Sequence, residues 1–460
     1  MKKIILILIS LLLMSGCQKK NTEVFDYDKT LFDNSYVHEV NIEITKEDYE
    51  DLLKHPTDKT KYTVDIVIDN ERYEEVSFST KGNSSLYFVA DDETSDRYSY
   101  KINFSKNREN QTCHGLDKLN LNNLYKDASY MKDFISYDMF KTAGIDSPLI
   151  AYCVVKFNGI EHGLYAMVED IDKSFLKRNR NSEGVIYKPE ADLDLDMDEI
   201  AKIKEEGLNL DVDVNGADFI YSDDKLESYS DIFDNNVTHS EEADEKRVVK
   251  AIKGLNEGKD LENYLDTDEL IRYFATQVFL MNYDSYIGPM LHNYFLYENK
   301  GKLALFPWDY NSAFFTFTVL MPKDAYIDAT NYINYGIDTP LYLTEEEDRP
   351  MWKWIQDNEE YRIKYHEAMK EIIDKYIVSN KFENIINELH KLLRPYVEND
   401  PSAFYDVNKF DKACEALKLY GKLRSESILS QLDGKLSTYN NKQNIEDKID
   451  ASSLKLNDMQ

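Results

Sequence analysis

Alternating polar and apolar residues in the first 170 positions constrain the fold of this chain more than any other feature. Val40, Ile42 and Ile44 are separated by polar residues, and Asn158–Gly159 joins two further runs of the same kind. Because successive side chains on a strand point to opposite faces, such runs predict strands with one buried face, and Asn-Gly between them predicts a hairpin. The sequence therefore predicts a meandering antiparallel sheet in this part of the chain.

Helical spacing replaces the alternation in the second half of the chain. Apolar residues recur three and four positions apart behind a predicted cap at Asp266, and helical patterns dominate from Trp352 to Leu432. We therefore predict an α+β fold, with a β-rich N-terminal lobe over residues 36–190 and a C-terminal lobe over residues 191–432 that contains a hairpin and helices. The polar residues 433–460 are predicted to form a disordered tail.

The first residues resemble an export signal. Two lysines precede an apolar run from Ile4 to Met14, and two small residues follow it before Cys17. The run is too short for a permanent membrane span, so residues 1–16 are predicted to be a lipoprotein signal peptide, Cys17 the site of lipid attachment and residues 17–35 a tether. This predicts an extracytoplasmic protein, lipid-anchored to the cell membrane; the alternative for the run is a buried core helix.

Charge and cysteine content exclude several classes of partner and site. The 460 residues include 55 basic and 86 acidic side chains, for a net charge of −31, which argues against nucleic acid or anionic lipid as the main partner. Beyond Cys17, only Cys113, Cys153 and Cys414 remain, widely spaced, so neither a zinc site nor a disulfide framework is predicted. We expect the protein to act as a monomer.

A second predicted hairpin brings three oxygen-bearing side chains together. Two alternating runs meet at Asn299–Gly301, so Asn293 and Asp309 should emerge at the same end, beside the loop that carries Asp284. Two carboxylates and an amide around one point suit a hard cation such as Mg²⁺ bound to phosphates, with one carboxylate left to orient a hydroxyl. The alternative is that these side chains only cap turns and close loops.

Competing catalytic motifs find little support in the sequence. The stretch from Gly254 to Asp260 has the wrong spacing for a Walker-type phosphate loop and lacks the hydroxyl that should follow its lysine. The Gly-x-Ser-x-Gly motif of many hydrolases is missing. His292 has no partner at metal-ligand spacing, so we interpret it as a packing or positioning residue.

Six blocks of sequence, in their order along the chain, resemble the spore coat protein H (CotH) kinase family. The resemblance runs from about Val40 to Leu432, and its most specific parts are the Asp-Ser-Tyr to His-Asn-Tyr stretch and the Pro-Trp-Asp-Tyr motif. It implies an atypical protein-kinase-like fold of two lobes, with an antiparallel-sheet N-lobe and a mainly helical C-lobe, that transfers phosphate from ATP to serine on exported proteins. The blocks are Lys81 to Ser85, Leu119 to Gly144, Gly163 to Asp172, Tyr187-Lys188, Asp284 to Tyr297 and Pro307-Trp308-Asp309.

The resemblance assigns roles to individual residues. Asp284 matches the catalytic aspartate, while Asn293 and Asp309 match the residues that hold Mg²⁺ or Mn²⁺. Lys101 and Lys188 compete for the role of the lysine that binds phosphate, and a solvated surface position is the alternative for both. Glu169 is expected either to pair with such a lysine or to be a simple strand-end charge. The residues expected to contact ATP are Lys81, Gly82, Ser84, Ser85, Lys101, Glu169 and Lys188.

Three departures from the family pattern leave a second function open. Lys81 stands where the family usually has arginine, Asn103 where a second lysine is usual, and Phe315 where a glycine is usual. The first hypothesis is a secreted, membrane-anchored kinase acting on serine of cell-surface or spore-coat proteins, with an exported serine-rich protein as its partner. The alternative is a catalytically weak, kinase-like surface module for binding or adhesion. Transfer of a nucleotide instead of a phosphoryl group would use the same metal site.

Overall fold

The computed structural model describes residues 25–191, 214–317 and 328–460. The predicted signal peptide and the predicted lipidation site Cys17 lie outside these residues. Among the helices that are described, none is long and apolar enough to cross a membrane.

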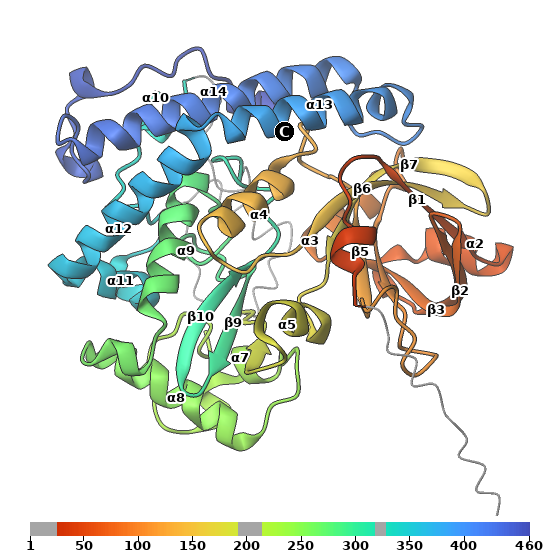
Figure 1. Cartoon of the computed structure of the whole chain (residues 1–460), viewed down its shortest axis with the longest axis horizontal. Helices are drawn as coiled ribbons and strands as arrows, with labels where there is room; N and C mark the ends of the chain where they lie inside the picture. Colours follow the sequence, from red (N-terminus) through yellow and green to blue (C-terminus); the bar gives the residue numbers. More distant parts are fainter. Residues whose placement is uncertain (1–24, 192–213, 318–327) are drawn as a thin grey trace, which may run out of the picture.

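Seven strands of the N-terminal part form a closed barrel with the strand order β1-β2-β3-β4-β5-β7-β6 (Figure 1). Its interior is filled by the alternating apolar side chains, among them Val40, Ile42 and Tyr100, which are fully buried. Three short helices pack against it: α1 (Tyr27–Thr30), α2 (Lys46–Lys54) and α3 (Ser84–Ala90). The strands are β1 (His38–Glu43), β2 (Tyr62–Ile68), β3 (Glu71–Lys81), β4 (Ser99–Asn103), β5 (Lys118–Asn122), β6 (Ile150–Phe157) and β7 (Ile160–Glu169).

The closed barrel corrects the predicted fold. The chain is α+β, as expected, but the prediction of a kinase-like two-lobed fold with an antiparallel-sheet N-lobe is wrong. β1 runs parallel to β6, with His38 opposite Cys153 and Ile42 opposite Phe157, and this pairing closes the sheet. Alternation decides which face of a strand is buried, but it does not decide which distant strand becomes its neighbour.

The remainder of the chain is mainly helical around a small antiparallel sheet. This sheet has the order β10-β9-β8, with β8 (Val185–Tyr187), β9 (Tyr294–Asn299) and β10 (Lys302–Pro307). In Figure 1 the long helices α13 and α14 cross above α4, α9 and α12, and the β9–β10 hairpin lies between α9 and α5. The helices are α4 (Lys132–Thr142), α5 (Lys173–Arg180), α7 (Ser230–Phe233), α8 (Glu242–Glu257), α9 (Thr267–Leu280), α10 (Thr330–Ile333), α11 (Pro350–Asp357), α12 (Glu359–Ile372), α13 (Lys381–Asn399) and α14 (Val407–Leu432), with a π-helix at Ile373–Val378.

Two local predictions that position the site are confirmed. The Asp266 side chain accepts a hydrogen bond from the Glu269 backbone N–H and so caps α9. The second hairpin turns tightly at Lys300 and Gly301, which both have positive φ, and pairs Lys302 with Asn299. Glycine adopts this left-handed conformation without steric cost, which explains why the turn falls there.

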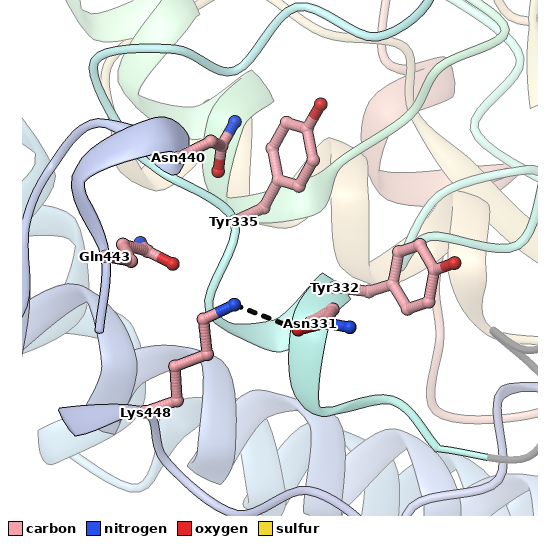
Figure 2. A pocket seen from close by; sticks show the side chains of 6 residues that line it. All are labelled: Asn331, Tyr332, Tyr335, Asn440, Gln443 and Lys448. Carbon is pink, nitrogen blue, oxygen red and sulfur yellow. Dashed lines mark hydrogen bonds between the residues drawn. The ribbon is translucent and has the colours of Figure 1, made fainter. Parts of the chain in front are cut away.

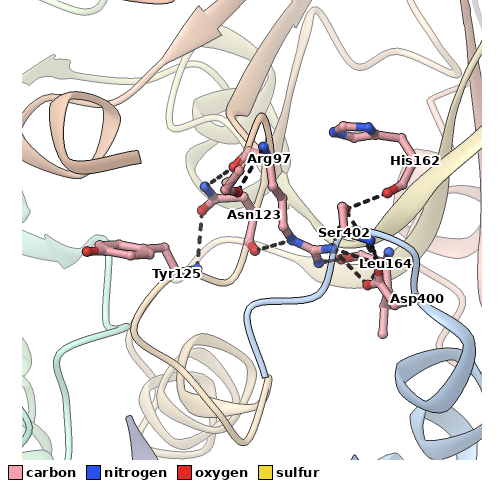
Figure 3. A network of polar contacts seen from close by, with 8 residues as sticks. Arg97, Asn123, Tyr125, His162, Leu164, Asp400 and Ser402 are labelled. Atoms are coloured by element: carbon pink, nitrogen blue, oxygen red, sulfur yellow. Dashed lines mark hydrogen bonds and ion pairs between the residues drawn. The ribbon is translucent and has the colours of Figure 1, made fainter. Parts of the chain in front are cut away.

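A buried ion pair joins the barrel to the helical part (Figure 3). The Arg97 guanidinium, just before β4, lies 2.8 Å from Asp400 in the connection between α13 and α14, and both side chains are fully buried. Asp400 also accepts from the backbone N–H of Leu164 on β7 at 2.9 Å. The Arg97 Nε donates to the Asn123 carbonyl at 3.0 Å, so the same side chain also orders the segment after β5.

Both ends of the described chain are more ordered than predicted. In the expected tether, Tyr27, Leu31 and Phe32 are buried against the barrel. The predicted disordered tail is also wrong, because residues 433–460 pack against the helical part with Leu454 and Met459 buried. Short 3-10 turns occur there at Asn440–Lys442, Ile445–Asp447 and Leu456–Met459. A few apolar side chains at wide intervals suffice to dock a polar segment, and no regular period marks them in the sequence.

Candidate functional site

Asp284 lies in the loop that follows α9. The helix ends where Met281 adopts a left-handed conformation with φ of 49°. The Asn282 side chain then accepts a hydrogen bond from the Asp284 backbone N–H at 3.1 Å. One carboxylate oxygen of Asp284 lies 2.6 Å from the His292 Nε2. Burial alone would lower the pKa of His292, but the Asp284 carboxylate raises it above its ordinary value. The histidine that we interpreted as a positioning residue therefore orients the candidate catalytic carboxylate.

Asn293 and Asp309 flank the base of the β9–β10 hairpin. Tyr294 pairs with Pro307 at that end of the ladder, so Asn293 and Asp309 leave the sheet at the same end, as the sequence predicted. Both adopt the left-handed conformation, with φ of 60° and 53°. Asparagine and aspartate enter this region more readily than most residues, but an aspartate there still needs support from its surroundings.

Several charged candidate residues shift the pKa of the Asp309 carboxyl. Burial raises the pKa of the Asp309 carboxyl, the Lys81 ammonium opposes this rise, and the Asp284 carboxylate adds to it. His292 and Lys188 also lower this pKa. Two carboxylates that repel each other favour a cation near them, and oxygen ligands fit a hard one such as Mg²⁺ or Mn²⁺. In the described part of the chain, no group of three or more His, Cys, Asp or Glu side chains is placed to hold a metal ion.

Lys81 reaches this site from the end of β3. Its Nζ donates to the Asn122 Oδ1 at 2.7 Å and lies 5.6 Å from the centre of the Trp308 ring, next to Asp309. Burial lowers the pKa of the Lys81 ammonium and Asp309 raises it. Gly82 follows with φ of 115°, a conformation that only glycine adopts at low cost. Ser84 and Ser85 form the first turn of α3.

Two other predicted ATP contacts, Lys101 and Lys188, act on the charged residues of this site. The Lys101 ammonium lies 2.8 Å from Asp170 and acts electrostatically on Lys81, so it belongs to the same region. Lys188 forms an ion pair with Glu190 and acts on Asp309.

Glu169 is the exception. It is fully buried and pairs with Arg178 at 2.5 Å, and the Tyr27 hydroxyl donates to it at 2.5 Å. The expected pair between Glu169 and a lysine is therefore replaced by contacts that hold α1 and α5 on the barrel.

The sequence analysis missed several residues that the fold brings to this region. Asp133, in the first turn of α4, accepts a hydrogen bond from the Tyr310 backbone N–H at 2.6 Å, and burial together with Asp309 raises its pKa to about 7. Asp170 binds Lys101, and Lys118 lies 3.9 Å from it. Asn122 holds Lys81. Asp133 resembles an ordinary helix-starting acid in the sequence, and only its position opposite the Pro-Trp-Asp motif distinguishes it.

Asp172 next to this cluster gives a pH-dependent prediction. Burial and the neighbouring Asp170 raise the pKa of Asp172 to about 7. The native state therefore holds a proton that the unfolded chain loses near pH 4, so this residue lowers stability as the pH rises from about 4 to about 7. We expect Asp172→Asn, whose amide oxygen can still accept from the Ser174 N–H, to stabilise the protein by about 1 kcal/mol or more at pH 8 and by less at pH 5. Thermal unfolding of both proteins at the two pH values measures this, and an equal gain at both would contradict the shifted pKa.

A separate polar cavity of ≈ 220 Å³ lies in the helical part (Figure 2). None of the candidate residues lines it, although Tyr332 in its wall packs on Phe315, with ring centres 4.5 Å apart. The candidate site is therefore defined by converging charged side chains. The lining residues are Asn331, Tyr332, Tyr335, Asn440, Gln443 and Lys448.

The comparison with protein families identifies the family of this chain. The family described as CotH kinase protein matches residues 78–428, so the chain belongs to the CotH kinase family. The matched range contains Asp284, Asn293 and Asp309 together with all the predicted ATP contacts. Among curated proteins, the chain is 24% identical over 398 residues to the inner spore coat protein H of Bacillus subtilis (strain 168), an alignment that covers 83% of this chain and 96% of that protein.

Proposed function

We propose that this protein is a metal-dependent kinase that transfers the γ-phosphate of ATP to serine on proteins outside the cytoplasm. The observation that carries the proposal is the convergence of two carboxylates and a lysine: Asn282 is hydrogen-bonded to the backbones of both Asp284 and Asp309, and the Lys81 Nζ lies 5.6 Å from the centre of the Trp308 ring, next to Asp309. A metal bound to phosphate, a nearby cation and a free carboxylate are the groups that phosphoryl transfer requires. Membership of the CotH kinase family supports the same chemistry.

Each residue has a definite task in this proposal. Asn293 and Asp309 would hold Mg²⁺ or Mn²⁺, which supplies neutralising charge for the phosphates. Lys81 and Lys101 would contact phosphate oxygens, and Gly82 allows close approach of the backbone. Asp284, oriented by His292, would accept the proton of the serine hydroxyl while the serine oxygen bonds to the γ-phosphorus of ATP. The bond between the γ-phosphorus and the bridging oxygen breaks, and ADP leaves.

The location and partner follow from separate observations. The N-terminal pattern supports a lipid on Cys17 and attachment to the outer side of the membrane. The relative named as an inner spore coat protein supports a place at the spore or cell surface, and we propose a serine-rich exported protein there as the substrate. The acidic composition argues against nucleic acid as the main partner, and we propose a monomer.

The structure offers one argument for activity and one against. Asn103, which stands where the family usually has lysine, pairs with Lys118 on β5, so a positive charge is present next to the missing one. Phe315 has φ of 58°, where the usual glycine would be unstrained. Phe315 therefore favours the second candidate, a surface module with weak turnover, while Lys118 supports the kinase.

The deciding experiment incubates the purified protein with γ-labelled ATP, Mg²⁺ or Mn²⁺ and a serine-rich exported protein, beside Asp309→Asn. We expect label on serine with the parent and at least about 100-fold less with the variant, because the variant loses a negatively charged metal ligand. Chelation of the metal should stop the transfer. No transfer and no metal-dependent ATP binding by the parent would overturn the kinase and leave the surface module.

A further inference from the structure

A single buried amide contacts both loops of the candidate site. Gln277 lies in the last turns of α9 with no solvent exposure. Its Nε2 donates to the Asn282 carbonyl at 2.8 Å and to the Ser285 hydroxyl at 2.9 Å, so it holds the loop on either side of Asp284. Its Oε1 accepts a hydrogen bond from the hydroxyl of Tyr310, the residue after Asp309. All the polar atoms of this side chain are thus directed at the two loops.

A second buried amide forms another link between the same loops. The Asn282 Oδ1 accepts from the Asp284 N–H, and its Nδ2 donates to the Asp309 carbonyl at 3.3 Å. The Gln277 side chain donates to the backbone carbonyl of Asn282, and the Asn282 side chain donates to the carbonyl of Asp309. The two residues therefore form a continuous series of hydrogen bonds from α9 to Asp309. We call Gln277 and Asn282 the amide brace.

Asp309 depends on side chains for its conformation. Its N–H donates to the Tyr137 hydroxyl at 3.0 Å, its carbonyl accepts from Asn282, and the next N–H donates to Asp133. A left-handed aspartate persists only where its surroundings enforce it. Backbone hydrogen bonds connect residues 280–281 with residues 314–315. Among the described residues, the neighbouring stretches 282–285 and 309–310 are instead connected by hydrogen bonds that involve side chains, such as that from Asn282 to the Asp309 carbonyl.

We propose that Gln277 and Asn282 are positioning residues that set the separation of Asp284 and Asp309. This inference rests on the proposed kinase function, because that separation matters for transfer between a metal-bound phosphate and a serine hydroxyl. A buried amide that served only packing would need partners, but those partners need not lie on both sides of the site. Here the three side-chain hydrogen bonds of Gln277 all end in one of the two loops.

The test compares Gln277→Met and Tyr310→Phe with Tyr365→Phe in the complete protein. Gln277→Met keeps the size of the side chain and removes all three bonds, and Tyr310→Phe removes one hydroxyl. Tyr365→Phe is the matched control, because its buried hydroxyl donates to the Ile337 carbonyl at 2.8 Å in the helical part. Hydrogen exchange of the loop amides, Mn²⁺ affinity, and the kcat and KM for ATP are measured for each protein.

We expect Gln277→Met to exchange faster in both loops at once, to bind Mn²⁺ more weakly and to lose about 100-fold in kcat, because small displacements of reacting groups cost that much. Tyr310→Phe should lose about tenfold in kcat, and in both variants KM for ATP should change less than kcat, since Lys81 and Lys101 are untouched. Tyr365→Phe should match the parent in all of these measurements.

The outcomes separate the brace from the kinase. Equal exchange in the parent and Gln277→Met, or faster exchange in only one loop, would overturn the brace whatever the activity. Faster exchange in both loops with unchanged kcat would overturn its positioning role. A parent that transfers no phosphate would overturn the proposed kinase, and the brace would then be judged by exchange and Mn²⁺ affinity alone.

Discussion

Replacing Asp284 by asparagine is expected to lower kcat for serine phosphorylation about 10³-fold, because general-base catalysis contributes this much. Asparagine has the size of aspartate, and its oxygen can still contact His292, which lies 2.6 Å from the carboxylate in the parent. It cannot take up the serine proton, however, and it carries no charge to orient the hydroxyl. The loss should therefore appear in kcat, with little change in KM for ATP, and initial rates at several ATP concentrations separate the two.

The chain contains a matched control for this substitution. Asp338 lies 2.7 Å from the His366 Nε2 in the helical part, so Asp338→Asn changes the same kind of pair away from the site. We expect Asp338→Asn to keep the transfer rate of the parent, whatever it does to stability. If Asp284→Asn retained the parental rate, or if both variants lost it equally, Asp284 would not be the catalytic base.

Local geometry was predictable from the sequence wherever neighbours in the chain decide it. The tight turn near Gly301 fixes the register of the second hairpin, and that register brings Asn293 and Asp309 to one end. The Asp266 cap fixes the start of α9, and the length of the helix then places the loop with Asp284. Asp284, Asn293 and Asp309 could therefore be proposed as a site, because a nearby turn or helix determines the position of each.

Long-range pairing could not be predicted in the same way. β1 carries the alternation of a half-buried strand, and nothing in its residues distinguishes an edge of an antiparallel sheet from a strand that closes a barrel by pairing with β6. A lysine was predicted as the partner of Glu169 because the sequence does not show that Arg178, in the following helix α5, forms an ion pair with it. Gln277 did carry a signal, since a glutamine among the buried apolar residues of α9 requires internal partners. Its partners are known only once the two loops have been placed.

The buried pair of Arg97 and Asp400 predicts the largest effect on stability. Asp400→Ala is expected to lower the free energy of unfolding by about 3–5 kcal/mol, because it leaves the Arg97 charge buried without its partner. It also removes an acceptor of the Leu164 N–H, so the α13–α14 connection loses its hold on the barrel. Glu43→Ala is the control, because the ion pair between Glu43 and Arg72 lies on the surface, with 36% and 45% of these side chains exposed, and should contribute little to stability.

Denaturant unfolding of the three proteins measures the difference, and combining Asp400→Ala with Arg97→Met should recover part of the loss, because the second change removes the unpaired charge. If Asp400→Ala and Glu43→Ala lowered the free energy of unfolding by the same small amount, the stabilising role of the buried Arg97–Asp400 pair would be contradicted.

The pair of Arg97 and Asp400 also affects the site. Arg97 donates a hydrogen bond to the Asn123 carbonyl, and the adjacent Asn122 accepts one from Lys81. Loss of the ion pair should therefore weaken ATP binding and raise KM, while Asp284 and Asp309 stay in place. Stability and KM should therefore change together in Asp400→Ala, whereas Asp284→Asn changes kcat alone.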